Sequence, residues 1–235
     1  MSKQIAVIGL GKFGVNLASA LHNGGYDVLA IDKVADIVEN IAPNVGQAVR
    51  ADATNESVLK KLGITNFNVA VVAIGAAIQE SVMVTILLKK LGVRHVVARA
   101  DNELHGSILE KIGADKVVYP ERDTALRIAP ILNLRDVNDY IPITSGSGAS
   151  KVMVPPYFVG KTLLDIGFGP GGKREVVVLL IQRGKEAIIN PSLQEVVSHI
   201  DVLLVTGNDS EVEKLFAEAE KTAQEEEQKE NNNKH

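Results

Sequence analysis

The first half of the chain alternates between short, mostly apolar runs and longer stretches in which apolar residues recur at helical spacing. The apolar runs lie at residues 5–8, 26–31, 47–50, 69–74, 95–98 and 116–119. A continuously apolar run is typical of a parallel strand covered on both faces, and the amphipathic stretches between the runs predict helices. We therefore predict an α/β domain with a doubly wound, Rossmann-like parallel sheet that binds its ligand at the carboxyl ends of the strands.

One helix is predicted to follow the first strand directly, and others are predicted at 35–42, 56–62, 81–91, 104–112 and 124–134. Pro43 and Asn44 are expected to end the helix at 35–42, because proline and asparagine favour turns. Either Thr54 or Asn55 is expected to cap the helix at 56–62. Pro130 has no N–H group to donate, so it is expected to kink the last helix.

The pattern changes from Asn138 onward, where turn residues separate shorter strands. Strands are predicted at 140–144, 151–154, 176–182, 187–189 and 202–205, followed by a helix at 211–219. This predicts a second, smaller α+β domain. We accordingly place a nucleotide-binding domain at 1–134 and a second domain at 135–220. The acidic stretch 221–235 is expected to be a frayed helix end or disordered.

A glycine-rich turn follows the first strand and opens the first helix. It contains Gly9, Leu10, Gly11, Lys12, Phe13 and Gly14, and Asp32 ends the second strand. Glycines at this spacing permit a tight turn and bring phosphates close to the backbone at a helix N-terminus, and an acid after the next strand binds ribose hydroxyls. The combination predicts an adenine-nucleotide site. The alternative is a structural glycine turn whose acid only caps the following helix.

Other candidate binding residues follow the ends of neighbouring strands and therefore share one edge of the predicted sheet. They are Lys33, Asp52, Ala53, Thr54, Ala73, Ile74, Gly75 and Arg99. Asp52 and Thr54 are placed to line the adenine side, although a capping role is an alternative. Arg99 is placed either to balance phosphate charge or to pair with Asp101 or Glu103.

Lys12 and Glu121 bear on which nucleotide the site takes. A cation within the glycine turn favours a nucleotide with terminal phosphates, and hence ADP or ATP, with NAD(H) as the alternative ligand. The structural alternative is that Lys12 is a solvated surface lysine. Asp32 would repel a 2′-phosphate, which disfavours NADP. Glu121 follows a strand end, where a carboxylate suits Mg²⁺ or Ca²⁺ bridging phosphates; otherwise it is a solvated acid.

Composition removes several classes of function. The 235 residues carry a net charge of −4 and contain no cysteine. The acidic balance argues against broad attraction to nucleic acid, and the lack of cysteine excludes disulfides and thiol catalysis. The histidines show no metal-binding or catalytic spacing, so no enzyme is predicted; an NAD-dependent oxidoreductase is the alternative. We find no targeting segment and no apolar run long enough to cross a bilayer.

Several longer motifs resemble one family. They lie at 6–14, 52–54, 67–75, 111–115 with 120–123, and 183–186 with 190–191. Through these motifs the chain resembles the cytosolic RCK (KTN) regulatory, or gating ring, subunits of bacterial Trk/Ktr-type potassium uptake systems, with an RCK-C (TrkA-C) domain at the C-terminus. The match is closer to Ktr-type rings than to the duplicated Trk form.

The resemblance implies a cytoplasmic homo-oligomer, an octameric ring of dimers, docked on an integral membrane potassium-translocating subunit. Exchange of ATP for ADP would change the ring's shape and so gate the partner. Lys12 stands where the family often has an arginine on the γ-phosphate. Glu121 matches the family's glutamate near a cation at the dimer interface.

The resemblance also implies a cyclic di-AMP site in the second domain. Residues at matching positions are Ile166, Phe168, Val177, Asn190 and Pro191, with Lys173 and Arg174 as phosphate contacts. The turn 167–174 departs from the family's pattern and is longer than its usual turn.

Overall fold

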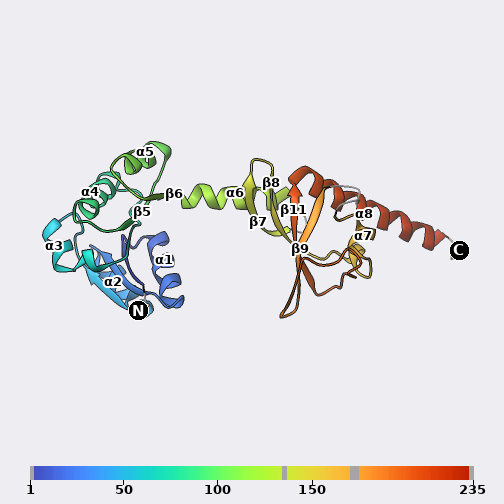
Figure 1. Cartoon of the computed structure of the whole chain (residues 1–235), viewed down its shortest axis with the longest axis horizontal. Coiled ribbons are helices and arrows are strands. Elements are labelled where there is room, and N and C mark those ends of the chain that lie inside the picture. The colour runs from blue at the N-terminus through green and yellow to red at the C-terminus, as the bar shows by residue number, and fades with distance from the viewer. Residues whose placement is uncertain (1–2, 134–136, 170–174, 233–235) are drawn as a thin grey trace. The chain divides into compact units, whose positions relative to one another are not determined.

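The computed structural model describes residues 3–133, 137–169 and 175–232. It divides into two compact units, Met1–Glu121 and Arg122–His235, each with its own sheet (Figure 1). The division falls at the start of helix α6 (Pro120–Asn133), whereas the boundary predicted from sequence lies at the far end of that helix.

A parallel sheet of six strands forms the centre of the first unit, as the apolar runs predict. The strands are β1 (Gln4–Ile8), β2 (Asp27–Asp32), β3 (Gln47–Arg50), β4 (Val69–Val72), β5 (His95–Arg99) and β6 (Lys116–Val118), in the order β3-β2-β1-β4-β5-β6. The chain moves outward from β1 to β3 and then crosses to the other side at β4. This reversal between β1 and β4 leaves a crevice at the carboxyl ends of the strands, where doubly wound sheets bind ligands.

Helices cover both faces of this sheet. They are α1 (Lys12–Asn23), α2 (Ala35–Ile41), α3 (Glu56–Lys61), α4 (Ile78–Lys90) and α5 (Glu103–Lys111), with short 3₁₀ turns at Ala42–Asn44 and Ile64–Asn66. One apolar core lies on each face of the sheet. The cap of α3 is Asn55, whose Oδ1 accepts the Ser57 N–H at 3.0 Å. Helix α4 begins at Ile78 rather than at residue 81, which places Glu80 in its first turn.

An antiparallel sheet forms the centre of the second unit. Its strands are β7 (Val137–Thr144), β8 (Ser147–Met153), β9 (Val176–Arg183), β10 (Glu186–Ile189) and β11 (Asp201–Asn208), in the order β10-β9-β11-β8-β7. Helix α6, the short α7 (Leu163–Ile166), a 3₁₀ turn at Pro156–Phe158 and α8 (Asp209–Asn232) complete the unit. The rings of Phe158 and Phe216 lie 5.1 Å apart, and this contact joins α8 to the 3₁₀ turn at the core of the unit.

Two helices are longer than their sequence patterns predict. Helix α6 starts at Pro120 instead of 124, and proline at the first helical position costs nothing because its missing N–H would have no helical partner there. Helix α8 continues to Asn232, through most of the stretch predicted to fray. That stretch contains neither glycine nor proline, and Lys221 and Glu225 form an i,i+4 ion pair at 4.0 Å.

Tyr140 links the start of α8 to strand β7. Its hydroxyl donates to the Asp209 carboxylate at 2.9 and 3.0 Å, and the ring is 2% exposed. Burial, and then the bond to Asp209, raises the pKa of Tyr140 to about 12. A pKa raised in the folded state stabilises the fold below the ordinary value of 10.0, and this contribution is lost as the pH rises through about 12.

We therefore expect Tyr140→Phe to lower the free energy of unfolding by about 1–2 kcal/mol near neutral pH, because Asp209 loses its donor. Chemical denaturation of the full chain measures this change. Between pH 10 and 12 the free energy of unfolding should also fall less in the variant than in the wild-type chain, since the phenylalanine ring cannot ionise. Tyr26→Phe is the matched control, because Tyr26 is 39% exposed. Equal unfolding free energies for the two variants would contradict the expected role of the bond.

Candidate functional site

The glycine turn between β1 and α1 has the geometry that close approach of an anion requires. Gly9 adopts φ +90° and donates its N–H to Ile31 O at 2.9 Å. A Cβ on Gly14 would overlap the Gly9 carbonyl oxygen, so α1 packs against the turn only because Gly14 has no side chain. Gly11 is the N-cap of α1, and a Cβ built on it meets open space. The positive end of the α1 dipole therefore faces an accessible surface.

Asp32 is fixed beside this turn by two backbone donors. Its Oδ2 accepts the Leu10 N–H at 2.6 Å, and its Oδ1 accepts the Val34 N–H at 2.9 Å. Val34 is the N-cap residue of α2, so Asp32 both supports the next helix and ties the glycine turn to β2. A carboxylate has about four acceptor positions, which leaves capacity for ribose hydroxyls. The two alternatives that the sequence offered for Asp32 are therefore compatible.

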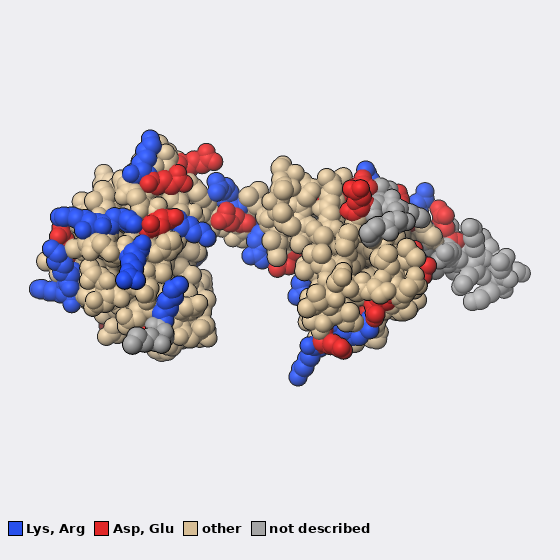
Figure 2. Space-filling model, in the orientation of Figure 1, with Lys and Arg blue, Asp and Glu red and all other residues tan. Residues whose placement is uncertain are grey.

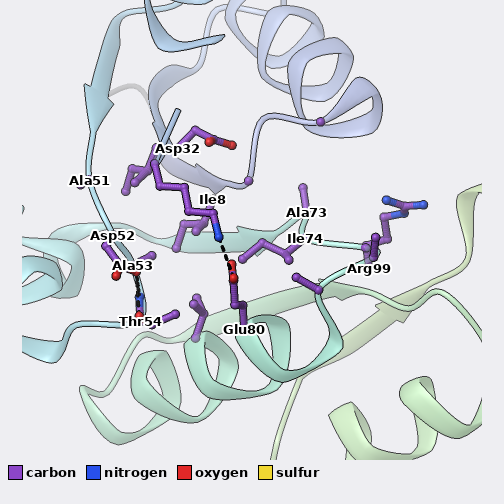
Figure 3. Close-up of a pocket in the computed structure, with 18 residues that line it drawn as sticks. Ile8, Asp32, Ala51, Asp52, Ala53, Thr54, Ala73, Ile74, Glu80 and Arg99 are labelled. Atoms are coloured by element: carbon purple, nitrogen blue, oxygen red, sulfur yellow. Dashed lines mark hydrogen bonds and ion pairs between the residues drawn. The ribbon is translucent and has the colours of Figure 1, made fainter. Parts of the chain in front are cut away.

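A pocket of about 320 Å³ opens at the crevice between the strand ends (Figure 3). The sequence-predicted residues that line it are Gly9, Gly11, Asp32, Lys33, Asp52, Ala53, Thr54, Ala73, Ile74, Gly75 and Arg99. These residues lie at the ends of β2 and β5 or in the segments that directly follow β1, β2, β3 and β4. Parallel strands end at one edge of the sheet, and this edge brings together residues that are far apart in sequence.

Five predicted residues lie outside this lining. Leu10 is 2% exposed beneath the turn, and Gly14 packs on Gly9. Phe13 packs against the core on the α1 side of the sheet. Lys12 lines a separate concave surface, between α1 and α2, together with Asn16 and Asn40. Glu121 does not line the pocket, and its carboxylate pairs with the lining residue Arg99.

The sequence analysis missed part of the lining. The additional residues are Ile8, Ile31, Ala51, Ala76, Ala77, Glu80 and Val84. Ile8, Ile31 and Ala51 adjoin predicted residues, so extending each strand-end prediction by one position would have included them. Glu80 carried no such signal, because the predicted helix began after it.

The end of the pocket beside Asp32 carries several charges. Lys33 Nζ lies 2.6 Å from Glu80 Oε1, and this pair connects the end of β2 to the start of α4 across the pocket (Figure 3). Asp52 Oδ1 accepts from the Thr54 hydroxyl at 2.7 Å and from the Thr54 N–H at 3.0 Å, and these bonds lower the pKa of Asp52. Asp52 is therefore ionised at neutral pH and held by its own loop.

Arg99 forms an ion pair with Glu121 at the other end of the pocket. Arg99 Nη2 lies 2.6 Å from Glu121 Oε1, and the Arg99 side chain is 17% exposed whereas that of Glu121 is 69% exposed. The guanidinium occupies the space that a Cβ on Gly75 would need. Arg99 Nε is buried and has no hydrogen-bond partner among the described residues. The sequence offered Asp101 or Glu103 as partners; the ion pair that the structure shows is to Glu121.

Among residues 3–133, 137–169 and 175–232, no cluster of three histidine, aspartate or glutamate side chains is arranged to hold a metal ion. No helix within the same ranges has the length and apolar character needed to span a bilayer.

The residues predicted for the second domain separate into buried and accessible ones. Phe168 is fully buried and Ile166 is 6% exposed, because both belong to the core of the second unit. Val177 is 37% exposed, and Asn190 and Pro191 lie after β10. Lys173 and Arg174 fall outside the described residues. As they stand, Ile166 and Phe168 shape the fold rather than a surface.

Comparison with known proteins gives two domain matches and full-length relatives. A TrkA-N domain matches residues 5–120, and a TrkA-C domain matches residues 149–219. Ktr system potassium uptake protein C of Bacillus subtilis (strain 168) is 40% identical over 215 residues, covering 92% of this chain and 96% of the relative. Protein A of that organism is 34% identical, covering 91% and 96%, and protein A of Vibrio alginolyticus is 34% identical, covering 87% and 92%.

Solved structures support the fold. The GsuK RCK domain aligns with a TM-score of 0.60 at 17% identity, covering 92% of this chain. The GsuK channel bound to NAD aligns with a TM-score of 0.58 at 16% identity, covering 90% of this chain. This chain spans 48% of the first structure and 38% of the second. At such low identity the likeness extends to the fold alone.

Proposed function

The chain belongs to the family of Ktr-type potassium uptake regulatory proteins that combine a TrkA-N and a TrkA-C domain, and we propose that it senses an adenine nucleotide and thereby gates a membrane potassium-translocating subunit. It acts as a regulatory subunit and not as an enzyme. The relatives are named as potassium uptake proteins, and their alignments extend over both domains.

The observation that carries this proposal is the charge arrangement of the pocket at the β1/β4 crevice. One side offers the glycine turn and the N-terminus of α1, which suit phosphates. The other side offers the fixed carboxylate of Asp32, which suits ribose hydroxyls, and Asp52 with Thr54 lies where the base would extend. The absence of a side chain on Gly11 leaves the phosphate position open. Adenosine phosphates fit this arrangement.

Discrimination between ATP and ADP is assigned to Lys12, Arg99 and Glu121. Lys12 has a flexible stem that can reach a terminal phosphate. Its ammonium lacks the bidentate fork of the arginine that the family often has at this position, so the difference in affinity between ATP and ADP is smaller. Glu121 holds Mg²⁺ or Ca²⁺ only together with nucleotide phosphates or a second subunit. NAD(H) is the alternative ligand of the same pocket.

Gating requires that the bound nucleotides stabilise different conformations of an assembly. A coupling of about 1–3 kcal/mol between ligand and conformation is typical of allosteric proteins. We propose that the assembly is an octameric, cytoplasmic ring on the inner face of the membrane. Exposed apolar residues of the second unit suit contacts with further copies: Leu126, Ile128 and Leu132 on α6, and Ile141 and Ile143 on β7.

Surface charge is consistent with protein partners rather than nucleic acid. In Figure 2, acidic and basic side chains are interspersed over the visible face of the first unit, and much of the visible face of the second unit is uncharged.

Cyclic di-AMP is proposed as a second ligand, with Val177, Asn190 and Pro191 as its accessible contacts among the described residues.

The proposal predicts micromolar-scale binding of ATP and ADP to the purified full chain, measured by calorimetry. Asp32→Asn should weaken both about tenfold, because the amide offers one oxygen instead of a charged carboxylate. Asp36→Asn is the control, since Asp36 lies nearby in the first turn of α2 and does not line the pocket. The functional readout is potassium flux into vesicles that contain the membrane subunit, with ATP against ADP.

Failure to bind any adenosine phosphate would contradict the nucleotide-sensing role. Steady reduction or oxidation of a metabolite with NAD(H) would instead support the oxidoreductase alternative. Equal potassium flux with ATP and ADP would separate binding from gating and overturn the regulatory assignment.

A further inference from the structure

Glu80 lies opposite Asp32 across the nucleotide pocket and has no role in the assignments above. It sits in the first turn of α4, and its carboxylate accepts a hydrogen bond from Lys33 Nζ at 2.6 Å (Figure 3). Lys33 directly follows the ribose-side acid Asp32 at the end of β2. The pair therefore joins two walls of the pocket at the end where the ribose and base would lie.

Lys33 by itself would favour a different nucleotide. In dinucleotide-binding sheets, a cation near the end of the second strand accommodates the 2′-phosphate of NADP. The Lys33 side chain is 57% exposed and has a flexible stem, so an unpaired ammonium could turn toward such a phosphate. The bond to Glu80 fixes this ammonium on the opposite wall.

The charge balance at this end acts in the same direction. Among the pocket-lining residues at this end, Asp32, Asp52 and Glu80 supply three carboxylates and Lys33 supplies one ammonium. Arg50, whose Nε donates to Lys33 O at 3.2 Å, lies outside the lining. A 2′-phosphate brings close to two further negative charges. A free 2′-hydroxyl brings none and can donate a hydrogen bond to a carboxylate.

We propose that Glu80 is a specificity-determining residue, which holds Lys33 across the pocket and thereby selects adenine nucleotides with a free 2′-hydroxyl over those with a 2′-phosphate. This inference rests on the proposed nucleotide-binding function and refines its ligand class. Glu80 acts by withdrawing Lys33 from the ribose and by adding negative charge beside it.

We expect the fold to stay intact when the Glu80 charge is removed. The Glu80 side chain is 37% exposed, and ion pairs between exposed side chains contribute little to stability. Glu80→Gln also keeps the length and shape of the side chain. A change in binding by this variant therefore reports on recognition rather than on unfolding, and thermal denaturation confirms that the variant is folded.

The experiment compares 5′-AMP with adenosine 2′,5′-bisphosphate as competitors of a labelled ADP on the full chain. The wild-type chain should bind the bisphosphate at least tenfold more weakly than AMP. Glu80→Gln should strengthen bisphosphate binding about tenfold and change AMP binding less than about twofold, because only the 2′-phosphate meets the freed ammonium. Adding Lys33→Met to this variant should remove the gain.

Glu56→Gln is the matched control, because Glu56 forms a comparable pair with Lys90 at 2.6 Å and lies outside the pocket lining. An unchanged bisphosphate-to-AMP ratio in Glu80→Gln would overturn the inference while leaving the proposed function standing, and so would an equal gain in Glu56→Gln. If the wild-type chain binds neither competitor nor ADP, the proposed function itself fails, and this inference fails with it.

Discussion

A Gly14→Ala chain is expected to lose nucleotide binding and a large part of the stability of its first unit. The added Cβ would overlap the Gly9 carbonyl oxygen, lie 3.0 Å from the Gly9 carbonyl carbon and lie 3.2 Å from Ala73 Cβ. Two of these three atoms belong to the backbone, so no side-chain rotation relieves the clash. Helix α1 would have to move away from β1, or the turn would have to change its conformation.

The turn cannot yield easily, because Gly9 is constrained from several sides. It adopts φ +90°, its N–H bonds to Ile31 O at 2.9 Å, and a Cβ there would lie 2.7 Å from Ile74 Cγ1. Overpacking of this kind costs about 1–3 kcal/mol, and the displaced α1 terminus no longer faces the phosphates. We expect the ADP dissociation constant to rise at least about 100-fold, measured by calorimetry alongside chemical denaturation.

Gly11→Ala is the matched control within the same turn. Gly11 has φ −64°, which alanine adopts without strain, and its Cβ would meet nothing within 4 Å. This variant should keep its free energy of unfolding to within about 1 kcal/mol, the cost of alanine at an N-cap. Its nucleotide affinity should fall less than that of Gly14→Ala. Wild-type ADP affinity in Gly14→Ala would show that the turn is not part of the site.

Replacing Arg183 with methionine is expected to destabilise the second unit by about 2–3 kcal/mol. Arg183 holds the buried carboxylate of Asp201 with Nε at 2.9 Å and Nη2 at 2.8 Å, and it also binds Glu195 at 3.0 Å and Val196 O at 3.0 Å. The Asp201 side chain is fully buried. Without Arg183, Asp201 retains the Ser198 N–H as a donor at 2.9 Å and becomes a poorly compensated buried charge.

The expected loss of unfolding free energy is smaller than the full cost of breaking a buried ion pair. The reason is that the Arg183 side chain is 30% exposed, so water can replace part of its hydrogen bonding. Arg127→Met is the control in the same unit. In the ion pair of Arg127 with Asp139, the two side chains are 53% and 44% exposed, so removing this pair should cost less than about 1 kcal/mol. Differential scanning calorimetry of the full chain measures both losses. Equal losses in the two variants would contradict the importance of burial.

The same cluster predicts the acid sensitivity of the second unit. Burial alone would raise the pKa of Asp201, but the hydrogen bonds from Arg183 and Ser198 outweigh burial and lower it below 3.8. A lowered pKa in the folded state stabilises the fold above the unfolded pKa, and this contribution is lost as the pH falls through the folded pKa. Arg183→Met reverses the shift, so its acid unfolding should begin at a higher pH than that of the wild-type chain.

Much of the fold follows from local sequence patterns. The central strands β1, β2 and β4 are short runs that are apolar because both of their faces are covered, and such runs can be recognised without knowing their partners. The glycine turn and Asp32 are likewise local, because Gly9, Gly11 and Gly14 and the acid at the end of β2 occupy the spacing that one strand-turn-helix-strand unit imposes. Gly9, Gly11 and Asp32 line the pocket, and Gly14 packs against Gly9 beneath it.

The predictions that failed or fell short concern where elements begin and end and which side chains meet. The start of α4 at Ile78 and the end of α8 at Asn232 depend on packing and side-chain pairs that a hydrophobic pattern does not contain. Ile166 and Phe168 lie in the core of the second unit, and their part in a ligand site stays a prediction.

The sequence by itself determined the parallel sheet, the glycine turn after β1 and the acid at the end of β2, because each strand, turn and strand end depends on residues close together in the chain. Only the tertiary structure decided that Lys33 meets Glu80, 47 positions away, and that Arg99 meets Glu121, 22 positions away. The physical reason is that charge pairing acts through space between side chains whose separation is set by the sheet, whereas strand and turn preferences act along the chain.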